Sequence, residues 1–171
     1  VKKEVDDFGG IAIIIHELCL NGTDRIIHYL QNYYIANTIS LKNKVVINIQ
    51  GDEPFINIKN ISKAIDNYIN KKEDENIVCS TIHHMTRDVD TIKLKSRGKL
   101  VLDKNNNIMY CSRNVIPSNK NYNIVPDTDY YIHIGIFVFD ASYLIKHYNN
   151  NNTRLQLIED IEWMKIMEQG F

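Results

Sequence analysis

The stretch VVINIQGDEPFI, residues 45–56, joins a hydrophobic run to two adjacent carboxylates. Its apolar first half predicts a buried strand, and Gly51 and Pro54 predict a sharp turn after that strand. Asp52 and Glu53 therefore fall at the carboxyl end of a strand, which is where open α/β sheets bind their ligands. A carboxylate there, with no His or Cys cluster nearby, suits Mg²⁺ bound jointly with substrate phosphates. The alternative is that both carboxylates only decorate the turn or cap the next helix.

Elsewhere in the chain, short apolar runs alternate with segments of helical periodicity. Helices are expected at 2–8, 23–37, 57–69, 141–148 and 155–169, and strands at 11–15, 45–49, 77–82, 99–103, 108–112 and 130–139. Gly9 and Gly10 are expected to end the first helix, and Thr23 is expected to cap the second. Strands that alternate with helices over this length predict one α/β domain with a mostly parallel sheet.

Length and composition bound the class of protein. The chain has 171 residues, of which 44% are hydrophobic and 24% charged, and its net charge is −1. These values are ordinary for a globular protein, and they produce no field that draws the chain to nucleic acid or to a membrane. Three isolated cysteines fit reduced thiols better than a disulfide framework. We therefore expect a cytoplasmic protein, with neither nucleic acid nor a membrane as partner.

Several further segments match one known family in the same order. They are NGTDRI at 21–26, KLVLDKNNNIMYCSRNVIP at 99–117, HIGIFVF at 133–139 and RLQLIEDIEWMKIMEQG at 154–170. Together with QGDEP, they resemble the motifs of the 3-deoxy-manno-octulosonate (Kdo) cytidylyltransferases. The resemblance implies an α/β fold of the nucleotide-diphospho-sugar-transferase type, a Rossmann-like three-layer sandwich with a mostly parallel sheet.

The same resemblance implies one reaction. CTP and Kdo give CMP-Kdo and pyrophosphate with Mg²⁺ as cofactor, and the product feeds lipopolysaccharide synthesis. A sugar oxygen attacks the α-phosphate in line, so that positioning and charge neutralisation supply most of the catalysis. Asp52 matches the metal-binding aspartate of QGDEP, whereas Glu53 supports it or fixes the turn. The resemblance also implies a homodimer.

Three matched positions are expected to line the CTP pocket, namely Gly22, Thr23 and Arg25. From the residues alone, Thr23 is better explained as a helix cap and Arg25 as a solvated side chain. Gln50 matches a glutamine beside the reacting centre, where its amide can donate and accept hydrogen bonds to nucleotide and sugar.

The acid sugar is expected to contact three further residues. Arg113, which we also expect to be catalytic, matches an arginine that grips the sugar carboxylate, because a guanidinium binds a carboxylate bidentately. His133 and Glu162 match residues that contact the sugar, and Gly135 leaves room for a ligand beside His133. The plainer alternatives are a surface ion pair for Arg113, a core histidine and a solvated helix carboxylate.

Two positions depart from the family motifs. Phe137 stands where many members have Tyr, and Trp163 stands where they have Gln. Both changes fall in the sugar half of the site, so the alternative substrates are 8-amino-Kdo and a sialic acid.

The family's N-terminal phosphate-binding loop and its C-terminal metal-binding segment have no counterpart in this sequence. Residues 1–171 are therefore expected to form a single cytidylyltransferase domain that lacks both segments and is inactive by itself. The remaining alternative, if the chain is full length, is a non-catalytic homologue.

Overall fold

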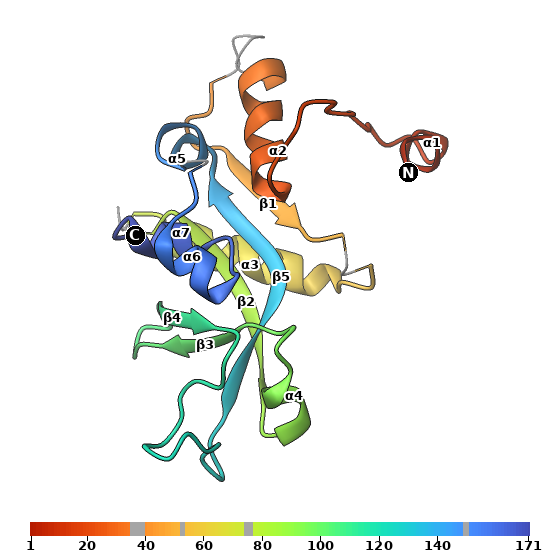
Figure 1. The fold of residues 1–171 in the computed structure, drawn as a ribbon. Helices are drawn as coiled ribbons and strands as arrows, with labels where there is room; N and C mark the ends of the chain where they lie inside the picture. The colour runs from red at the N-terminus through yellow and green to blue at the C-terminus, as the bar shows by residue number, and fades with distance from the viewer. Residues whose placement is uncertain (35–39, 52–53, 74–76, 149–150) are drawn as a thin grey trace. The chain divides into compact units, whose positions relative to one another are not determined.

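The computed structural model of the chain describes residues 1–34, 40–51, 54–73, 77–148 and 151–171 (Figure 1). The chain consists of two compact units, Val1–Leu41 and Lys42–Phe171. Within the described ranges, no helix combines the length and the apolar character that are needed to cross a membrane.

The first unit begins with helix α1, Lys2–Asp7. Gly9 has a φ of 81°, and the Gly10 N–H donates to the Val5 carbonyl oxygen at 2.9 Å, so the predicted glycine stop is confirmed. The strand predicted at 11–15 is wrong, because these residues are neither strand nor helix. A short apolar run becomes a strand only where another strand pairs with it, and the described part of this unit contains no other strand.

Helix α2, Gly22–Tyr29, continues into a π-helical turn, η1, at Leu30–Tyr34. Its N-cap is Asn21, whose side chain accepts a hydrogen bond from the Asp24 N–H at 2.8 Å. The cap predicted at Thr23 is therefore wrong by two residues, and Thr23 lies buried in the first turn. The last part of the predicted helix, residues 35–37, lies outside the described residues.

The second unit contains most of the regular structure. Its elements are β1 (Val45–Ile49), α3 (Ile58–Lys71), β2 (Cys79–Thr86), α4 (Val89–Lys93), β3 (Lys99–Leu102), β4 (Ile108–Ser112), β5 (Tyr130–Asp140), α5 (Ala141–Lys146), α6 (Arg154–Glu159) and α7 (Met164–Glu168). Helix α4 was not predicted. The single helix predicted at 155–169 is two helices, because Asp160 takes a left-handed conformation with a φ of 54° and ends α6.

The sheet is centred on β5, and every ladder in the described chain is antiparallel. Strand β2 pairs along one edge of β5, while β1 and β3 pair with different parts of its other edge, and β4 pairs with β3 (Figure 1). The prediction of a mostly parallel sheet is therefore wrong. The sheet is antiparallel because of the position of β5. Strands β1 and β2 run in the same direction, but β5 lies between them and runs in the opposite direction.

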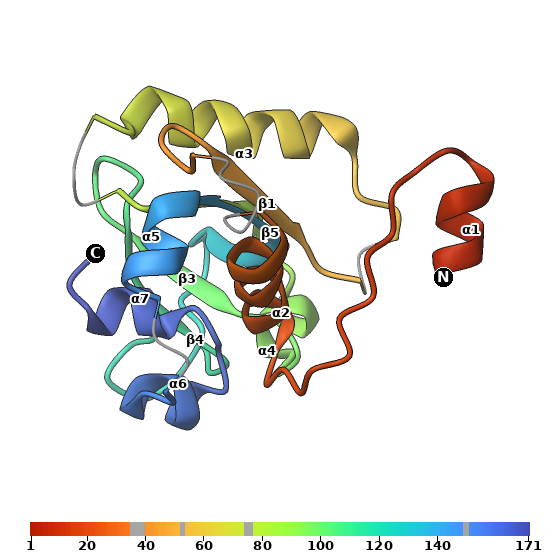
Figure 2. The ribbon, with the colours of Figure 1, turned by 90° about the horizontal axis from the view of Figure 1, so that it is seen from above.

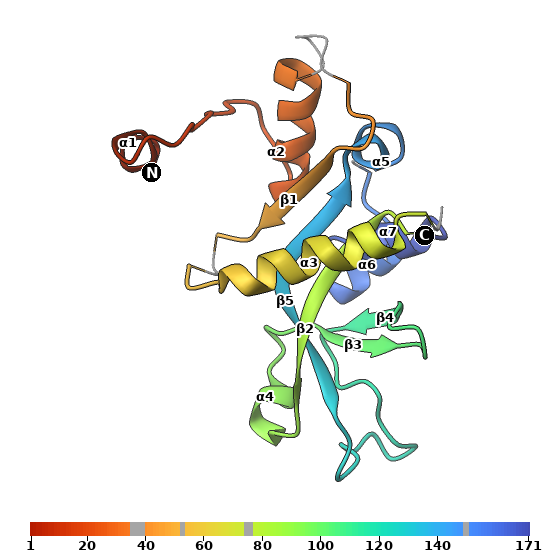
Figure 3. The ribbon, with the colours of Figure 1, turned by 180° about the vertical axis from the view of Figure 1, so that it is seen from behind.

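Helices cover both faces of this sheet (Figure 2). On one face, Ala64 and Tyr68 of α3 pack against buried side chains of β2 and β5, and Figure 3 shows α3 crossing these strands. On the other face, Met164 of α7 packs with Leu100 of β3 and Cys111 of β4. The mixed α/β architecture that the sequence predicted is thus present, with an antiparallel sheet in its middle layer.

Strand β1 was expected to be buried, and this expectation is wrong. Val45, Ile47 and Ile49 are each about two-fifths exposed. Among the described residues β1 pairs only with β5, so it forms one end of the strand order. These three alternate side chains point to one face of the sheet, and the described residues of this unit leave them partly exposed.

Candidate functional site

Gln50 follows β1, and its side chain covers Gly135 in the middle of β5. The Gln50 N–H donates to the Gly135 carbonyl oxygen at 3.0 Å. A Cβ atom at position 135 would lie 2.5 Å from Gln50 Oε1, so a larger residue there would require the Gln50 side chain to move. The space that was expected to admit a ligand is thus filled by Gln50. By strand alternation Gly135 shares its face with His133, so Gln50 and His133 lie on the same face of the sheet.

His133 is held by contacts on several sides. Its ring centroid lies 4.9 Å from that of Phe137 and 5.5 Å from that of Trp163. Its Nε2 atom is 2.8 Å from Thr81 Oγ1, and its main-chain N–H donates to the Gly98 carbonyl oxygen at 2.9 Å. The imidazole orientation is therefore fixed by packing and by hydrogen bonds together.

The environment of His133 predicts a loss of stability in acid. Burial, followed by the neighbouring His83 and Arg113, lowers the pKa of His133 from 6.5 to about 3. Below pH 6.5, His133 becomes protonated in the unfolded chain but stays neutral in the folded chain. The free energy of unfolding therefore decreases as the pH falls. Between pH 6.5 and 5 this removes about 2 kcal/mol of unfolding free energy.

We therefore expect denaturant unfolding of the complete protein to show a larger acid loss for the wild type than for His133→Gln. The stability change caused by His133 can be distinguished from changes caused by carboxylates, because Asp and Glu side chains ordinarily have lower pKa values than histidine. Parallel pH profiles for the two proteins would contradict this prediction.

The Arg113 side chain is held by main-chain carbonyl groups from two loops. Nη1 donates to Ser96 O at 2.8 Å, while Nη2 and Nε donate to Asp160 O at 2.8 and 3.3 Å. The Asp160 carboxylate lies 3.6 Å away and is 93% exposed, so this ion pair adds little stability. A guanidinium has five N–H groups. Within the described part of the chain, these contacts leave two of them for another acceptor.

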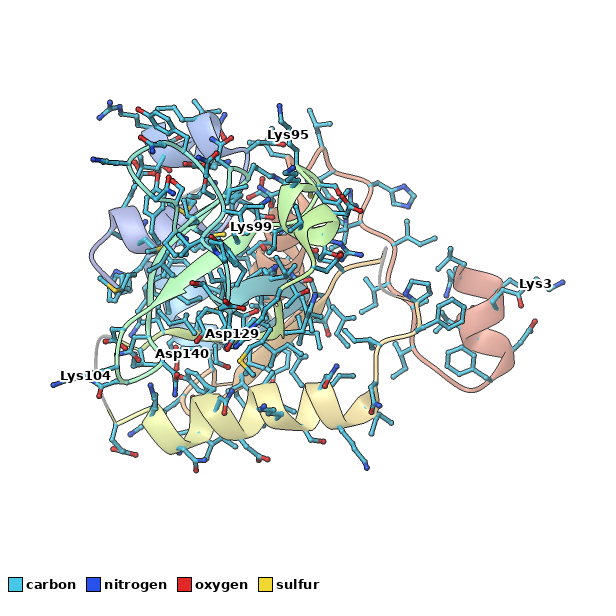
Figure 4. All side chains as sticks on the ribbon, turned by 90° about the horizontal axis from the view of Figure 1, so that it is seen from below. Lys3, Lys95, Lys99, Lys104, Asp129 and Asp140 are labelled. Atoms are coloured by element: carbon cyan, nitrogen blue, oxygen red, sulfur yellow. The ribbon has the colours of Figure 1, made fainter. Side chains whose placement is uncertain are left out.

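Two charged side chains hold the main chain of Arg113. Fully buried Lys99 donates from Nζ to the carbonyl oxygens of Leu94, Arg97 and Arg113 at 2.8, 2.8 and 2.6 Å. Glu159 Oε2 accepts the Arg113 N–H at 3.2 Å, and its carboxylate also accepts two hydroxyl groups from β4. Burial is the main cause that lowers the pKa of Lys99. Figure 4 shows Lys99 among packed side chains.

Glu162 lies just before α7, next to Trp163. Its Oε1 atom accepts a hydrogen bond from the Tyr148 hydroxyl at 2.7 Å. The Trp163 ring lies 6.0 Å from that of Phe137, and both rings contact His133. Phe137 and Trp163, the two positions that depart from the family motifs, therefore pack as apolar rings against His133.

A cavity of about 650 Å³ lies among α3, β2, the turn at 105–107 and α7. Phe137 and Trp163 line it, whereas Gln50, Arg113 and His133 are not among its lining residues. Thr81 also lines the cavity and contacts His133, so the cavity adjoins His133 through Thr81 and the two aromatic rings.

Three of the residues expected to bind the nucleotide belong to the first unit, whereas Gln50 belongs to the second. Gly22 begins α2, Thr23 is buried and Arg25 is exposed. Arg25 Nη1 donates to the Ile15 carbonyl oxygen at 2.8 Å. The start of a helix presents main-chain N–H groups, which can bind phosphate.

Asp52 and Glu53, the residues expected at the metal site, lie outside the described residues. Among the residues that the structure does describe, no group of three or more His, Cys, Asp or Glu side chains could hold a metal ion. Mg²⁺ commonly binds through one or two carboxylates together with substrate phosphates. By its donor chemistry, a single carboxylate at Asp52 fits such an ion when phosphates supply further ligands.

Sequence patterns did not identify Thr81, Lys99 or Glu159. Their partners His133, Arg113 and Arg113 lie 52, 14 and 46 residues away in the chain. Local periodicity carries no information about such distant contacts. The one available signal is Lys99 itself, a charge that opens the apolar run KLVL.

Gln50 lies beside Gly135 of β5, and Arg113 is an electrostatic neighbour of His133 on the same strand. This arrangement can be compared with known proteins. A family model described as cytidylyltransferase matches residues 1–171. The chain belongs to the cytidylyltransferase family. The resemblance of its motifs to this family is therefore confirmed along the whole sequence.

Two curated relatives of this cytidylyltransferase chain are named 3-deoxy-manno-octulosonate cytidylyltransferase. The protein from Protochlamydia amoebophila is 33% identical over 171 residues, and the match covers 100% of this chain and 63% of that protein. The protein from Fusobacterium nucleatum is 34% identical over 172 residues, with coverage of 100% and 64%. The chain thus spans less than two thirds of the length of these relatives.

A solved structure of CMP:2-keto-3-deoxy-manno-octonic acid synthetase complexed with CTP has a similar fold. It aligns with a TM-score of 0.80 at 23% identity, and the alignment covers 99% of this cytidylyltransferase chain and 64% of that chain. The mixed α/β fold of the chain is therefore similar to the fold of this synthetase.

Proposed function

We propose that the protein carrying this chain transfers a cytidylyl group from CTP to Kdo, giving CMP-Kdo and pyrophosphate. The observation that carries the proposal is the placement of Arg113 and His133, which both contact the loop at 96–98. The family match over residues 1–171 and the names of the relatives support the same reaction. We further propose that the enzyme acts in the cytoplasm as a homodimer, for lipopolysaccharide synthesis.

In this proposal the anomeric oxygen of the sugar attacks the α-phosphate of CTP. A new P–O bond forms as the bond to the pyrophosphate leaving group breaks, and the hydroxyl proton is released. Positioning of the two reactants supplies most of the rate enhancement. Mg²⁺, bound by Asp52 and the phosphates, would supply charge neutralisation.

The chain's own residues then divide the binding of the two substrates. Gly22, Thr23 and Arg25 contact CTP, and Gln50 lies between nucleotide and sugar. The two remaining N–H groups of Arg113 donate hydrogen bonds to the sugar carboxylate. A planar guanidinium suits such a contact with a planar carboxylate.

We propose that the acid sugar also lies near Glu162 and near the apolar rings of Phe137 and Trp163. These rings offer no acceptor to a sugar hydroxyl at the two positions where family motifs have polar side chains. The second candidate, supported by this observation, is transfer to another acid sugar such as 8-amino-Kdo or a sialic acid.

The experiment that tests the function is a pyrophosphate-release assay of the complete protein. CTP and Mg²⁺ are supplied with Kdo, 8-amino-Kdo or a sialic acid, each at several concentrations. We expect Kdo to give the highest kcat/KM. Highest activity with another acid would assign the second candidate, and no release with any acid would overturn cytidylyl transfer.

Replacing Arg113 with alanine tests the proposed carboxylate contact. Loss of a charged hydrogen bond is expected to raise the KM for the acid sugar by about tenfold or more, with a smaller effect on the KM for CTP. Asp160→Asn is the matched control, because it removes only the exposed carboxylate and keeps the main-chain carbonyl that Arg113 contacts. An unchanged KM for the sugar in Arg113→Ala would contradict the assignment.

A further inference from the structure

The hydroxyl group of Thr81 lies between His133 and a main-chain carbonyl of β5. Thr81 Oγ1 donates to Ile136 O at 2.6 Å, and the same oxygen lies 2.8 Å from His133 Nε2. A hydroxyl has one hydrogen, and a carbonyl oxygen can only accept. The hydrogen of Thr81 is therefore used by Ile136 O, so the imidazole must donate its proton to Thr81.

This network determines which ring nitrogen of His133 carries hydrogen. The Nε2 atom is protonated, because it donates to the hydroxyl. The low pKa of His133, caused mainly by burial, leaves the ring with a single proton. The Nδ1 atom is then an unprotonated acceptor.

The Nδ1 atom of His133 has no hydrogen-bond donor among the described residues. The ring is held between Phe137 and Trp163, and the main-chain N–H is bound to Gly98 O. In the described chain, no protein group donates to Nδ1, and this atom is not among the fully enclosed polar atoms that lack a partner. The Nδ1 atom therefore keeps some accessible surface and no protein donor.

We infer that Thr81 is a positioning residue that fixes His133 as a hydrogen-bond acceptor, so that Nδ1 selects a donor group of the substrate. The identity of the ligand rests on the proposed function, whereas the tautomer rests on the structure alone. A sugar hydroxyl is such a donor, and an ionised carboxylate is not. Arg113 has the opposite preference, because its two remaining N–H groups can only donate and therefore bind an acceptor such as a carboxylate.

The two residues together orient a polyhydroxylated acid. Its carboxylate is directed to Arg113 and a hydroxyl to His133. The reversed orientation would place a carboxylate against the Nδ1 lone pair, which is repulsive, and leave the guanidinium without its anion. Thr81, which touches no substrate, thereby contributes to the choice of orientation.

The tautomer is tested by NMR on the complete protein labelled with ¹⁵N in its histidines. The His133 signals are assigned by comparison with His133→Gln. We expect the wild type to show a protonated Nε2 and a bare Nδ1 from pH 8 to pH 5. Finding hydrogen on Nδ1, or a doubly protonated ring at pH 7, would overturn the inference.

Thr81→Val keeps the β-branched shape and removes the hydroxyl. The buried Nε2–H then has no acceptor, so the proton is expected to move to Nδ1 in most molecules. Thr81→Ser should restore the wild-type tautomer. Ser80→Ala is the matched control, because Ser80 donates to Ala64 O on the opposite face of β2 and does not contact His133. An unchanged tautomer in Thr81→Val would overturn the role of Thr81.

Kinetics separate this inference from the proposed function. Thr81→Val is expected to raise the KM for the acid sugar about fivefold, the cost of one hydrogen bond, with kcat changed by less than about twofold. A changed tautomer with an unchanged KM would overturn the sugar contact of His133 and leave cytidylyl transfer intact. Absence of activity with any acid sugar would overturn the proposed function, while the NMR result would still decide the tautomer.

Discussion

Replacement of Asp52 with alanine is expected to lower the turnover of the complete protein by about two orders of magnitude or more. Transfer at the α-phosphate develops negative charge on the leaving pyrophosphate, and a bound cation neutralises it. Asp52 is the carboxylate that the QGDEP motif offers for that ion. In the sequence it follows the partly exposed strand β1, and its removal is expected to change the free energy of unfolding little.

The measurement is pyrophosphate release as a function of Mg²⁺ concentration, together with a denaturation curve. Asp66→Ala is the control: Asp66 is an exposed carboxylate on α3, and its loss should leave turnover as in the wild type. If Asp52→Ala retained the wild-type rate and the wild-type response to Mg²⁺, Asp52 would not be the ligand.

Replacement of Lys99 with methionine is expected to cost about 3 kcal/mol of unfolding free energy. Methionine fills a similar volume, but it cannot donate to the three carbonyl oxygens that the ammonium contacts. Each buried group left without a partner costs about 1–3 kcal/mol. Removal of a buried charge offsets part of that sum, because the desolvation of the ammonium is no longer required.

Denaturant unfolding at pH 7 measures this loss, and Lys95→Met is the matched control. Lys95 lies in the loop before β3 and is exposed, as Figure 4 shows, so its replacement should change stability by less than about 0.5 kcal/mol. Equal stabilities of the two variants would show that the carbonyl contacts of Lys99 contribute nothing to the fold.

Local features of the fold could be predicted from the sequence because they depend on neighbouring residues. The hairpin of β3 and β4 is an example. Asp103 Oδ1 accepts hydrogen bonds from the main-chain N–H groups of Asn105 and Asn107, each at 2.8 Å, and Asn106 takes a φ of 62°. Asp and Asn are the residues that favour such a turn, so the composition of this segment was sufficient.

The direction of the sheet could not be predicted in the same way. Alternating strands and helices indicate parallel neighbours only if successive strands lie side by side. Here Val45 pairs with Asp140, and Cys79 pairs with Phe139. No local pattern near residues 45 or 79 records that β5 will lie between them.

In the candidate site, too, some groups could be predicted from the sequence and others could not. Motif similarity identified Arg113, His133 and Gln50, and the structure places all three in the second unit, with Gln50 and His133 on one face of β5. The groups that fix them, such as the carbonyl oxygens of Ser96 and Asp160, belong to the main chain. Main-chain partners have no residue type, so a sequence motif cannot reveal them.

The central position of β5 also sets the order in which the protein can assemble. Strands β1, β2 and β3 leave the ribosome before the strand to which each is bonded, because β5 begins only at Tyr130. Helix α3 and the β3–β4 hairpin need only nearby residues, so they can form early. The rest of the sheet must await translation of residues 130–140, and its pairings span long separations in the chain, a high contact order that is typical of slow folding.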